Sequence, residues 1–165
     1  RLGSMVADYA LAFRMQVLGY DPCSQHDQIP DGVKQVSLGA LLSGSDHVIW
    51  TAAYSPGDPV ILGRDQILAM KSGSTFVNVA RGELMDEAAL VEGLELGILR
   101  AVGVDVLPGD SRWTYGERVN SPLIEKSRQT DRVLVTPHVG GYAREAVNET
   151  RRFMVQRVNQ IIDIK

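Results

Sequence analysis

Short apolar runs alternate along the chain with segments whose apolar residues recur at helical spacing. The segment 6–13 has the three- and four-residue spacing of one helix face, and Ser4 is its expected N-cap. A β-prone run follows at 15–20, and a polar loop is expected at 25–31. The chain therefore begins with the pattern helix, strand, loop.

The rest of the chain repeats this alternation. Strands are predicted at 47–52, 75–79, 101–106 and 132–136, and helices at 37–42 (capped by Ser37), 62–70, 86–96 and 143–164. Residues 111–131 are expected to form a long insertion. Short apolar strands separated by amphipathic helices are typical of parallel βαβ units with helices on both faces of the sheet. We therefore expect one α/β domain with a doubly wound parallel sheet.

The composition excludes several classes of protein. The 165 residues are 44% apolar and 22% charged, as in an average soluble globular protein. No apolar run approaches the roughly 18 residues of a membrane-spanning helix. The net charge of −3 gives no electrostatic reason to expect nucleic acid as a partner. One cysteine and three histidines offer no cluster with metal-ligand spacing, and the lone Cys23 fits a reducing cytoplasm.

Charged residues and glycines gather where the predicted strands end. These groups are Asp21, the run 80–83, residues 105–110 and the run 137–141. Each has a simpler explanation when taken alone, such as a turn-forming Asp, a solvated Arg or a loop His. In doubly wound sheets, however, ligands bind beyond the carboxyl ends of the strands. The coincidence of all four groups at one edge predicts a single site.

Four ordered segments carry a family resemblance. They are 2–22, 41–52, 70–106 and 135–141, and the run Asn78–Glu87 (NVARGELMDE) is especially specific. On these segments the chain resembles the NAD-binding domain of the D-isomer-specific 2-hydroxyacid dehydrogenases. The resemblance implies a Rossmann-type fold whose first strand is missing here. It also implies an incomplete NAD-binding domain over residues 1–165, without the family's second, substrate-binding domain.

The resemblance implies an NAD site built from the strand-end loops. Of the family's glycine fingerprint only Arg1-Leu2-Gly3 remains, where the helix N-terminus favours the pyrophosphate. Asp21 has the spacing of the acid that binds the adenosine ribose, which favours NAD over NADP because a carboxylate repels a 2′-phosphate. Asp105 corresponds to the residue that fixes the nicotinamide ring. The remaining cofactor contacts are assigned to Ala52, Val79, Ala80, Arg81, His138 and Gly140.

The resemblance also assigns the chemistry. Arg81 corresponds to the arginine that binds the substrate carboxylate, and His138 to the acid/base that exchanges a proton with the C2 oxygen. The third member of this set, normally Glu, orients the histidine. It corresponds here to Asp110, whose side chain is shorter by about 1.5 Å. Glu117, in the insertion, is a second candidate for this role.

These assignments predict a cytoplasmic, NAD-dependent oxidoreductase that interconverts a 2-keto acid and a D-2-hydroxy acid by hydride transfer. No metal is expected, and the full-length protein is expected to be a homodimer. Thr51 and Ala53 stand where the family more often has His and Pro, which leaves the identity of the substrate open. Two alternatives remain: an NAD-sensing interaction module of corepressor type, and an inactive fragment.

Overall fold

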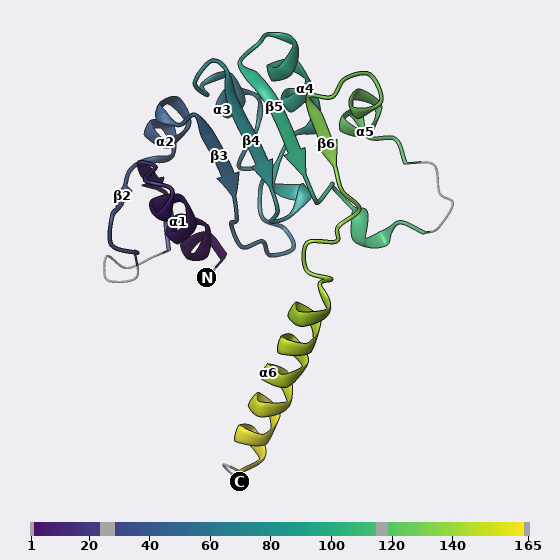
Figure 1. Ribbon diagram of the computed structural model, residues 1–165. Coiled ribbons are helices and arrows are strands. Elements are labelled where there is room, and N and C mark those ends of the chain that lie inside the picture. Colours follow the sequence, from purple (N-terminus) through teal and green to yellow (C-terminus); the bar gives the residue numbers. More distant parts are fainter. Residues whose placement is uncertain (1, 24–28, 115–118, 164–165) are drawn as a thin grey trace.

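Figure 1 shows the computed structural model of the chain, which describes residues 2–23, 29–114 and 119–163. The main sheet has the strand order β3-β4-β5-β6, and all its strands are parallel. A smaller sheet pairs β1 with β2, also in parallel. The strands are β1 (Val17–Gly19), β2 (Val33–Gln35), β3 (His47–Trp50), β4 (Ser74–Asn78), β5 (Leu99–Val104) and β6 (Val133–Val135). Parallel pairing between alternating helices confirms the predicted α/β class.

The helices link the strands in the alternating order that the sequence predicts. The α-helices are α1 (Leu2–Ala12), α2 (Leu38–Gly44), α3 (Arg64–Leu68), α4 (Glu87–Glu95), α5 (Pro122–Ser127) and α6 (Arg144–Asp163). Two short 3-10 helices, η2 (Gly82–Leu84) and η3 (Asp110–Arg112), lie in the loops after β4 and β5. Helix α6 projects away from the sheet (Figure 1). Among the described residues, no helix has the length and apolar character needed to cross a membrane.

The two sheets are separate within the described part of the chain. There, β1 pairs with β2 alone, and β3 pairs with β4 alone. In the strand order of doubly wound dinucleotide-binding folds, the first strand lies between the strands that correspond to β1 and β3. The observed sheet divides at the place that the resemblance assigns to that first strand.

Side-chain caps fix the starts of helices α2 and α4. The Ser37 hydroxyl accepts a hydrogen bond from the N–H of Ala40 at 3.3 Å, so the predicted cap of α2 is confirmed. Asp86 caps α4 in the same way. Ser4, in contrast, lies inside the first turn of α1 rather than at its N-cap. The prediction placed the start too late because exposed Leu2 and the following glycine carry no apolar periodicity.

Strand β2 and helix α5 were not predicted, nor were the two short 3-10 helices. Strand β2 contains a single apolar residue, Val33, and is recognisable only through its pairing with β1. Helix α5 lies within the expected insertion, where Ser121 caps it and Pro122 occupies its first turn. The Ser121 hydroxyl also donates to Glu87 at 2.5 Å, and burial raises the pKa of that carboxyl despite this hydrogen bond. The Ser-Pro pair was therefore a local signal for a helix start.

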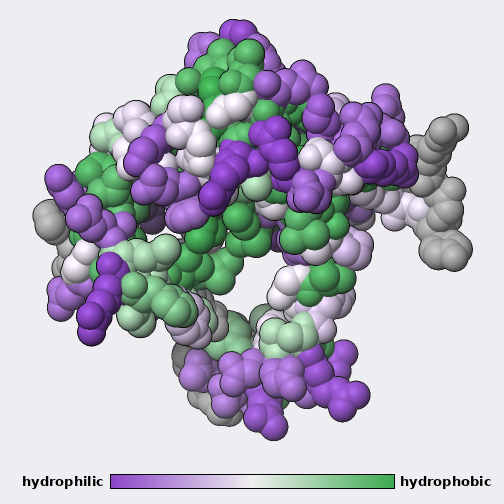
Figure 2. Space-filling view, turned by 45° about the horizontal axis from the view of Figure 1, so that its top comes forward, coloured by the Kyte–Doolittle hydropathy of each residue, from purple (hydrophilic) through white to green (hydrophobic). Residues whose placement is uncertain are grey.

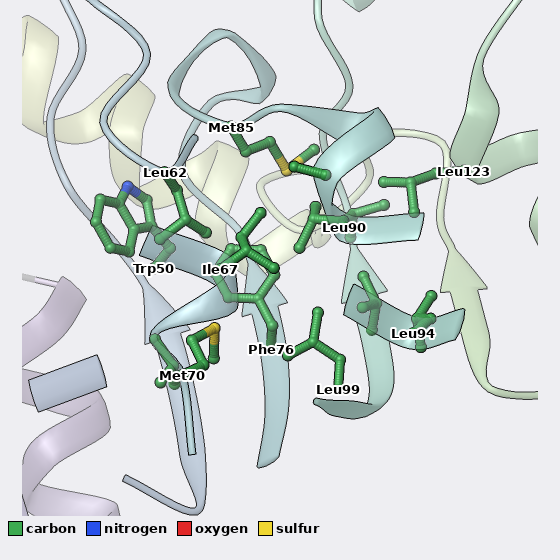
Figure 3. Packing of buried hydrophobic residues seen from close by; sticks show 14 of the residues in the cluster. Trp50, Leu62, Ile67, Met70, Phe76, Met85, Leu90, Leu94, Leu99 and Leu123 are labelled. Atoms are coloured by element: carbon green, nitrogen blue, oxygen red, sulfur yellow. The ribbon is translucent and has the colours of Figure 1, made fainter. Parts of the chain in front are cut away.

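The hydrophobic core lies between the main sheet and helices α3, α4 and α5. Burial alternates along β4, so that every second side chain points into this core. The packed side chains include Phe76, Leu90, Leu94, Leu99 and Leu123 (Figure 3). The opposite face of the sheet is less completely covered, since Ile49 and Leu134 are exposed. Dense packing on one face holds β4, β5 and β6 rigidly, and the loops that follow them inherit this placement.

Candidate active site

Three loops of the candidate site leave the main sheet at its carboxyl edge. Arg81 follows β4, Asp105 directly follows β5, and His138 follows β6. Because these strands are parallel neighbours, the loops emerge side by side. The N–H of Asp105 donates to the Asn78 carbonyl at 3.0 Å, which extends the strand register into the loops. The predicted gathering of these residues at one edge is thus present in the fold.

Asp110 and His138 are in direct contact. The Nδ1 atom of His138 lies 2.9 Å from Oδ2 of Asp110, and the two side chains form an ion pair whenever His138 is protonated. An ionised carboxylate only accepts hydrogen bonds, so Nδ1 carries the proton and Nε2 is left for another partner. The Asp110 side chain is 13% exposed and that of His138 is 37% exposed. The carboxylate therefore lies behind the imidazole.

The contact shows that the Asp110 side chain is long enough to reach the imidazole. Asp110 reaches the imidazole although its side chain is shorter than the family's usual Glu. Its Oδ2 atom also accepts from the N–H of Leu107 at 3.1 Å, which fixes the carboxylate on its own loop. Glu117, the other candidate, lies outside the described residues.

An open pocket of about 400 Å³ lies beside this pair. Its lining consists of Asp110, Ser111, Pro137, His138, Val139 and Tyr142. The space-filling view in Figure 2 shows an opening through the middle of the molecule, bordered in part by apolar surface. Arg81 does not belong to the lining of this pocket. Instead, its Nη1 atom donates to the carbonyl of Ala80 at 2.7 Å, so the guanidinium folds back on its own loop.

The turn that presents Arg81 is held by Asn78. This side chain is fully buried at the end of β4. Its Nδ2 atom donates to the carbonyl of Arg81 at 3.0 Å, and its Oδ1 atom accepts from the N–H of Ala80 at 2.9 Å. Sequence reasoning assigned no role to Asn78. The available signal was an amide side chain at a buried position of an apolar strand.

The loop that carries His138 is held by Asp105. The Oδ1 atom of Asp105 accepts from the Thr136 hydroxyl at 2.5 Å and from the N–H of Val139 at 3.0 Å, while Oδ2 accepts from the N–H of Gly140 at 2.8 Å. Between these contacts, the backbone of His138 adopts a left-handed conformation with φ of 53°. A Cβ at Gly140 would lie 2.8 Å from Oδ2 of Asp105, so a larger residue there would displace this carboxylate from its present position.

The surroundings of Asp105 favour its ionised form. Burial by itself would raise the pKa of this carboxyl. The hydrogen bonds from Thr136, Gly140 and Val139, together with the nearby His138, outweigh burial and lower the pKa. An ionised carboxylate offers about four lone-pair sites, of which the loop occupies three. One acceptor site is left, which fits an amide donor such as that of a nicotinamide.

The start of α1 lies against the end of β3. A Cβ at Gly3 would lie 2.8 Å from the hydroxyl oxygen of Thr51, so a larger residue there would require the Thr51 side chain to move. Leu2 begins the helix and is exposed, as is Ala52 after β3. The first N–H groups of a helix have no partner within it and favour anions. Arg1 lies outside the described residues.

Asp21 follows β1 in the smaller sheet. Its Oδ1 atom accepts from the N–H of Cys23 at 2.9 Å, which closes a local turn. The turn-forming explanation considered for this residue is therefore realised.

Several backbone groups assigned to the cofactor are engaged within the protein. The N–H of Val79 donates to Trp50 O at 3.3 Å, that of Ala80 to Asn78, and that of Gly140 to Asp105. Only their carbonyl groups are left for a ligand, and the carbonyl of Ala80 already accepts from Arg81. For contacts with a ligand, these loops therefore provide mainly backbone carbonyl groups and side chains.

Comparison with known families is decisive. Residues 1–140 match the family model described as D-isomer specific 2-hydroxyacid dehydrogenase, NAD binding domain. The chain belongs to this family.

Relatives of this dehydrogenase domain are similar over nearly all of its residues. A hydroxypyruvate reductase of Thermotoga maritima is 34% identical over 163 residues, which are 97% of this chain and 48% of that protein. A D-3-phosphoglycerate dehydrogenase of Methanocaldococcus jannaschii is 31% identical, with coverage of 98% and 29%. The chain thus spans about half or less of the length of these relatives.

A solved structure of a related enzyme matches the fold of this dehydrogenase domain. The D-lactate dehydrogenase of Aquifex aeolicus, in complex with NAD and lactic acid, superposes with a TM-score of 0.82 at 30% identity. The match covers 98% of this chain and 50% of that one. The predicted Rossmann-type NAD-binding fold is therefore confirmed.

Asp105 is expected to make the stability of the dehydrogenase domain depend on pH. Its folded pKa is below the ordinary value of 3.8, so it stabilises the fold above that pH, and this contribution is lost as the pH falls through the lowered pKa. Asp105→Asn should reduce the free energy of unfolding near neutral pH by about 1–3 kcal/mol, because it removes charged hydrogen bonds. It should also make the loss on acidification shallower.

Urea denaturation from about pH 7 to about pH 3 measures both effects. Thr136→Val removes one donor to Asp105 and should produce a smaller change in the same direction. Parallel pH curves for wild type and Asp105→Asn would contradict the assignment.

Proposed function

We propose that this domain belongs to an NAD-dependent enzyme that interconverts a 2-keto acid and a D-2-hydroxy acid. The contact between Asp110 and His138 at the sheet edge is the observation that supports this most directly. It provides an oriented imidazole beside an open pocket, with Arg81 on the loop after β4. The proposal concerns residues 1–165 together with the second domain that members of this family carry.

The residues divide the work by their chemistry. Arg81 binds the substrate carboxylate, because a guanidinium is permanently charged and forms two parallel hydrogen bonds to it. In reduction, Nε2 of His138 donates a proton to the C2 oxygen, and in oxidation it accepts that proton. Asp110 holds the imidazole through Nδ1 and forms an ion pair with it whenever the imidazole is protonated. Asp110 thus orients the proton donor without touching the substrate.

The residues present fit NAD as the cofactor. The first turn of α1 would receive the pyrophosphate, Asp21 the ribose, and the remaining acceptor site of Asp105 the nicotinamide amide. NAD supplies or accepts the hydride in such reactions. The step that the residues of this chain carry out is the transfer of a proton to or from the C2 oxygen.

The location and the partners of this enzyme are proposed from its composition and its relatives. We propose a cytoplasmic location, consistent with the exposed and unpaired Cys23. A nucleic-acid partner is not proposed, since the net charge is −3. The similar proteins named above are a reductase and dehydrogenases, which favours an enzyme over an NAD-sensing interaction module.

Variants of Arg81 and His138 should separate binding from proton transfer. In the full-length protein, His138→Gln should lower kcat for NADH-dependent keto-acid reduction by about 10² to 10⁴-fold. Arg81→Lys should mainly raise KM for the keto acid, because a point charge cannot form the paired hydrogen bonds. Arg100→Lys, at the opposite end of β5, is a matched control and should change neither parameter. If the full-length protein oxidises NADH with no 2-keto acid in a broad panel, the proposed function is wrong.

Asp21 should set the preference for NAD(H) over NADP(H). Asp21→Asn keeps an oxygen that can accept from the N–H of Cys23 but removes the charge, whereas Asp21→Ala removes both. If the charge sets the preference, both variants should bring the ratio of the NADP(H) to the NAD(H) dissociation constant closer to one, as measured by calorimetry on the full-length protein. A change of this ratio in Asp21→Ala alone would show that the turn matters instead. Tighter binding of NADP(H) than of NAD(H) by the wild-type protein would exclude the assignment.

A homodimer is proposed from the surface of α1. Met5, Tyr9 and Phe13 recur every four residues along this segment, and all are exposed. An apolar stripe of this kind is typical of a protein–protein contact. In sedimentation experiments on the full-length protein, Tyr9→Glu should shift a dimer to monomer, while Leu96→Glu, at an exposed position after α4, should not. A wild-type protein that sediments as a monomer would refute the proposal.

A further inference from the structure

The loop after β4 is locked against the loop after β5. A Cβ at Gly82 would lie 2.0 Å from the carbonyl carbon of Leu107 and 2.3 Å from the nitrogen of Pro108, so the two backbones are in direct contact. Next to this contact, Oε1 of Glu83 accepts from the N–H of Gly109 at 3.1 Å. The carboxylate of Glu83 is partly buried there. This side chain connects the turn that carries Arg81 to the residue directly before Asp110.

The conformation of Gly109 decides where Asp110 points. Gly109 adopts a left-handed backbone with φ of 75° and forms the N-cap of η3, whose first residue is Asp110. From this position, Asp110 accepts both from the N–H of Leu107 and from Nδ1 of His138. A displacement of Gly109 would therefore move the Asp110 carboxylate relative to the imidazole.

The short side chain of Asp110 makes this placement more demanding. An Asp carboxylate reaches about 1.5 Å less far than that of Glu, so the backbone must approach the imidazole more closely. The structure achieves a contact of 2.9 Å between Oδ2 and Nδ1. Two contacts of η2 hold the chain just before η3 in the position that this approach requires. They are the backbone contact of Gly82 with Leu107 and the hydrogen bond from Gly109 to Glu83.

We propose that Glu83 is a positioning residue for the Asp110–His138 pair. By accepting from the N–H of Gly109, it holds η3 where the shorter carboxylate reaches the imidazole. Because Glu83 lies two residues after Arg81, the same turn also fixes the substrate-binding guanidinium relative to the proton donor. This inference rests on the proposed function and adds the residue that couples its two halves.

The proposed role of Glu83 is to accept a hydrogen bond. Two substitutions distinguish this role from effects of its charge and of its packing. Glu83→Gln keeps an acceptor oxygen and removes the charge. Glu83→Met keeps a side chain of similar length and lacks a strong acceptor. Loss of function in the Met variant with retention in the Gln variant therefore identifies the hydrogen bond to Gly109.

The first readout needs neither substrate nor NAD. In the full-length protein labelled with ¹⁵N-histidine, NMR reports which imidazole nitrogen carries the proton, and His138→Gln identifies the signal. We expect the Nδ1–H signature of His138 to be retained in Glu83→Gln and lost in Glu83→Met. An unchanged signature in Glu83→Met, or its loss in both variants, would overturn the positioning role.

The second readout is the kinetics of keto-acid reduction. Glu83→Met should lower kcat by about 10- to 100-fold, as expected for a displaced catalytic group, with a much smaller change in KM. Adding Asp110→Glu to Glu83→Met should recover most of the lost kcat, because the longer side chain spans the larger gap. Failure of that double variant to recover kcat would count against the proposal. Absence of all activity in wild type would instead reject the proposed function, and the NMR signature would still decide the role of Glu83.

Discussion

The left-handed backbone of His138 is the constraint on which the candidate active site depends. A non-glycine residue in this conformation costs about 1–3 kcal/mol and persists only where its surroundings hold it. Asp105 provides that hold by accepting from the chain on both sides of His138. Asp105 and the held loop follow neighbouring strands, so the packing of β5 against β6 fixes the distance between them. The direction of the imidazole is therefore set by the sheet, through one carboxylate.

Two glycines allow the strand-end loops to make contact with one another. At Gly82 the space of a Cβ is filled by the backbone of the next loop, and at Gly140 it is filled by the Asp105 carboxylate. Together with the Asp110–His138 hydrogen bond, these contacts form a continuous path from the loop after β4 to the loop after β6. Each link in this path is a direct contact between atoms of neighbouring loops. Arg81 and His138 are held at the two ends of this path.

The sequence predicted the parts of the molecule that depend on local pattern. The apolar strands were identifiable because parallel strands buried by helices read as short apolar runs, and Ser37 was identifiable as a cap. Helix α5 was missed although Ser121 and Pro122 mark its start, because no apolar periodicity drew attention to them. The loop-holding roles of Asp105 and Glu83 were beyond sequence reasoning for another reason. The contacts of Asp105 and Glu83 join loops that are far apart in sequence, and the value of each depends on distances that only the fold sets.

The placement of charge is compatible with the anionic ligands proposed for a site rich in carboxylates. The proposed ligands, a dinucleotide and a 2-keto acid, are both negatively charged, yet Asp21, Asp105 and Asp110 stand at the strand ends. Each of these carboxylates accepts from the protein itself: Asp21 from a backbone N–H, Asp105 from a loop, and Asp110 from the imidazole and a backbone N–H. Their charge is thereby directed at protein donors. In the proposed function, the first N–H groups of α1, the guanidinium of Arg81 and Nε2 of His138 face the anionic groups and the reacting oxygen, while Asp21 and Asp105 face the ribose and the nicotinamide amide. The positive groups and free donors therefore meet negative charge, and the carboxylates meet protein donors or neutral, hydrogen-bond-donating parts of the cofactor.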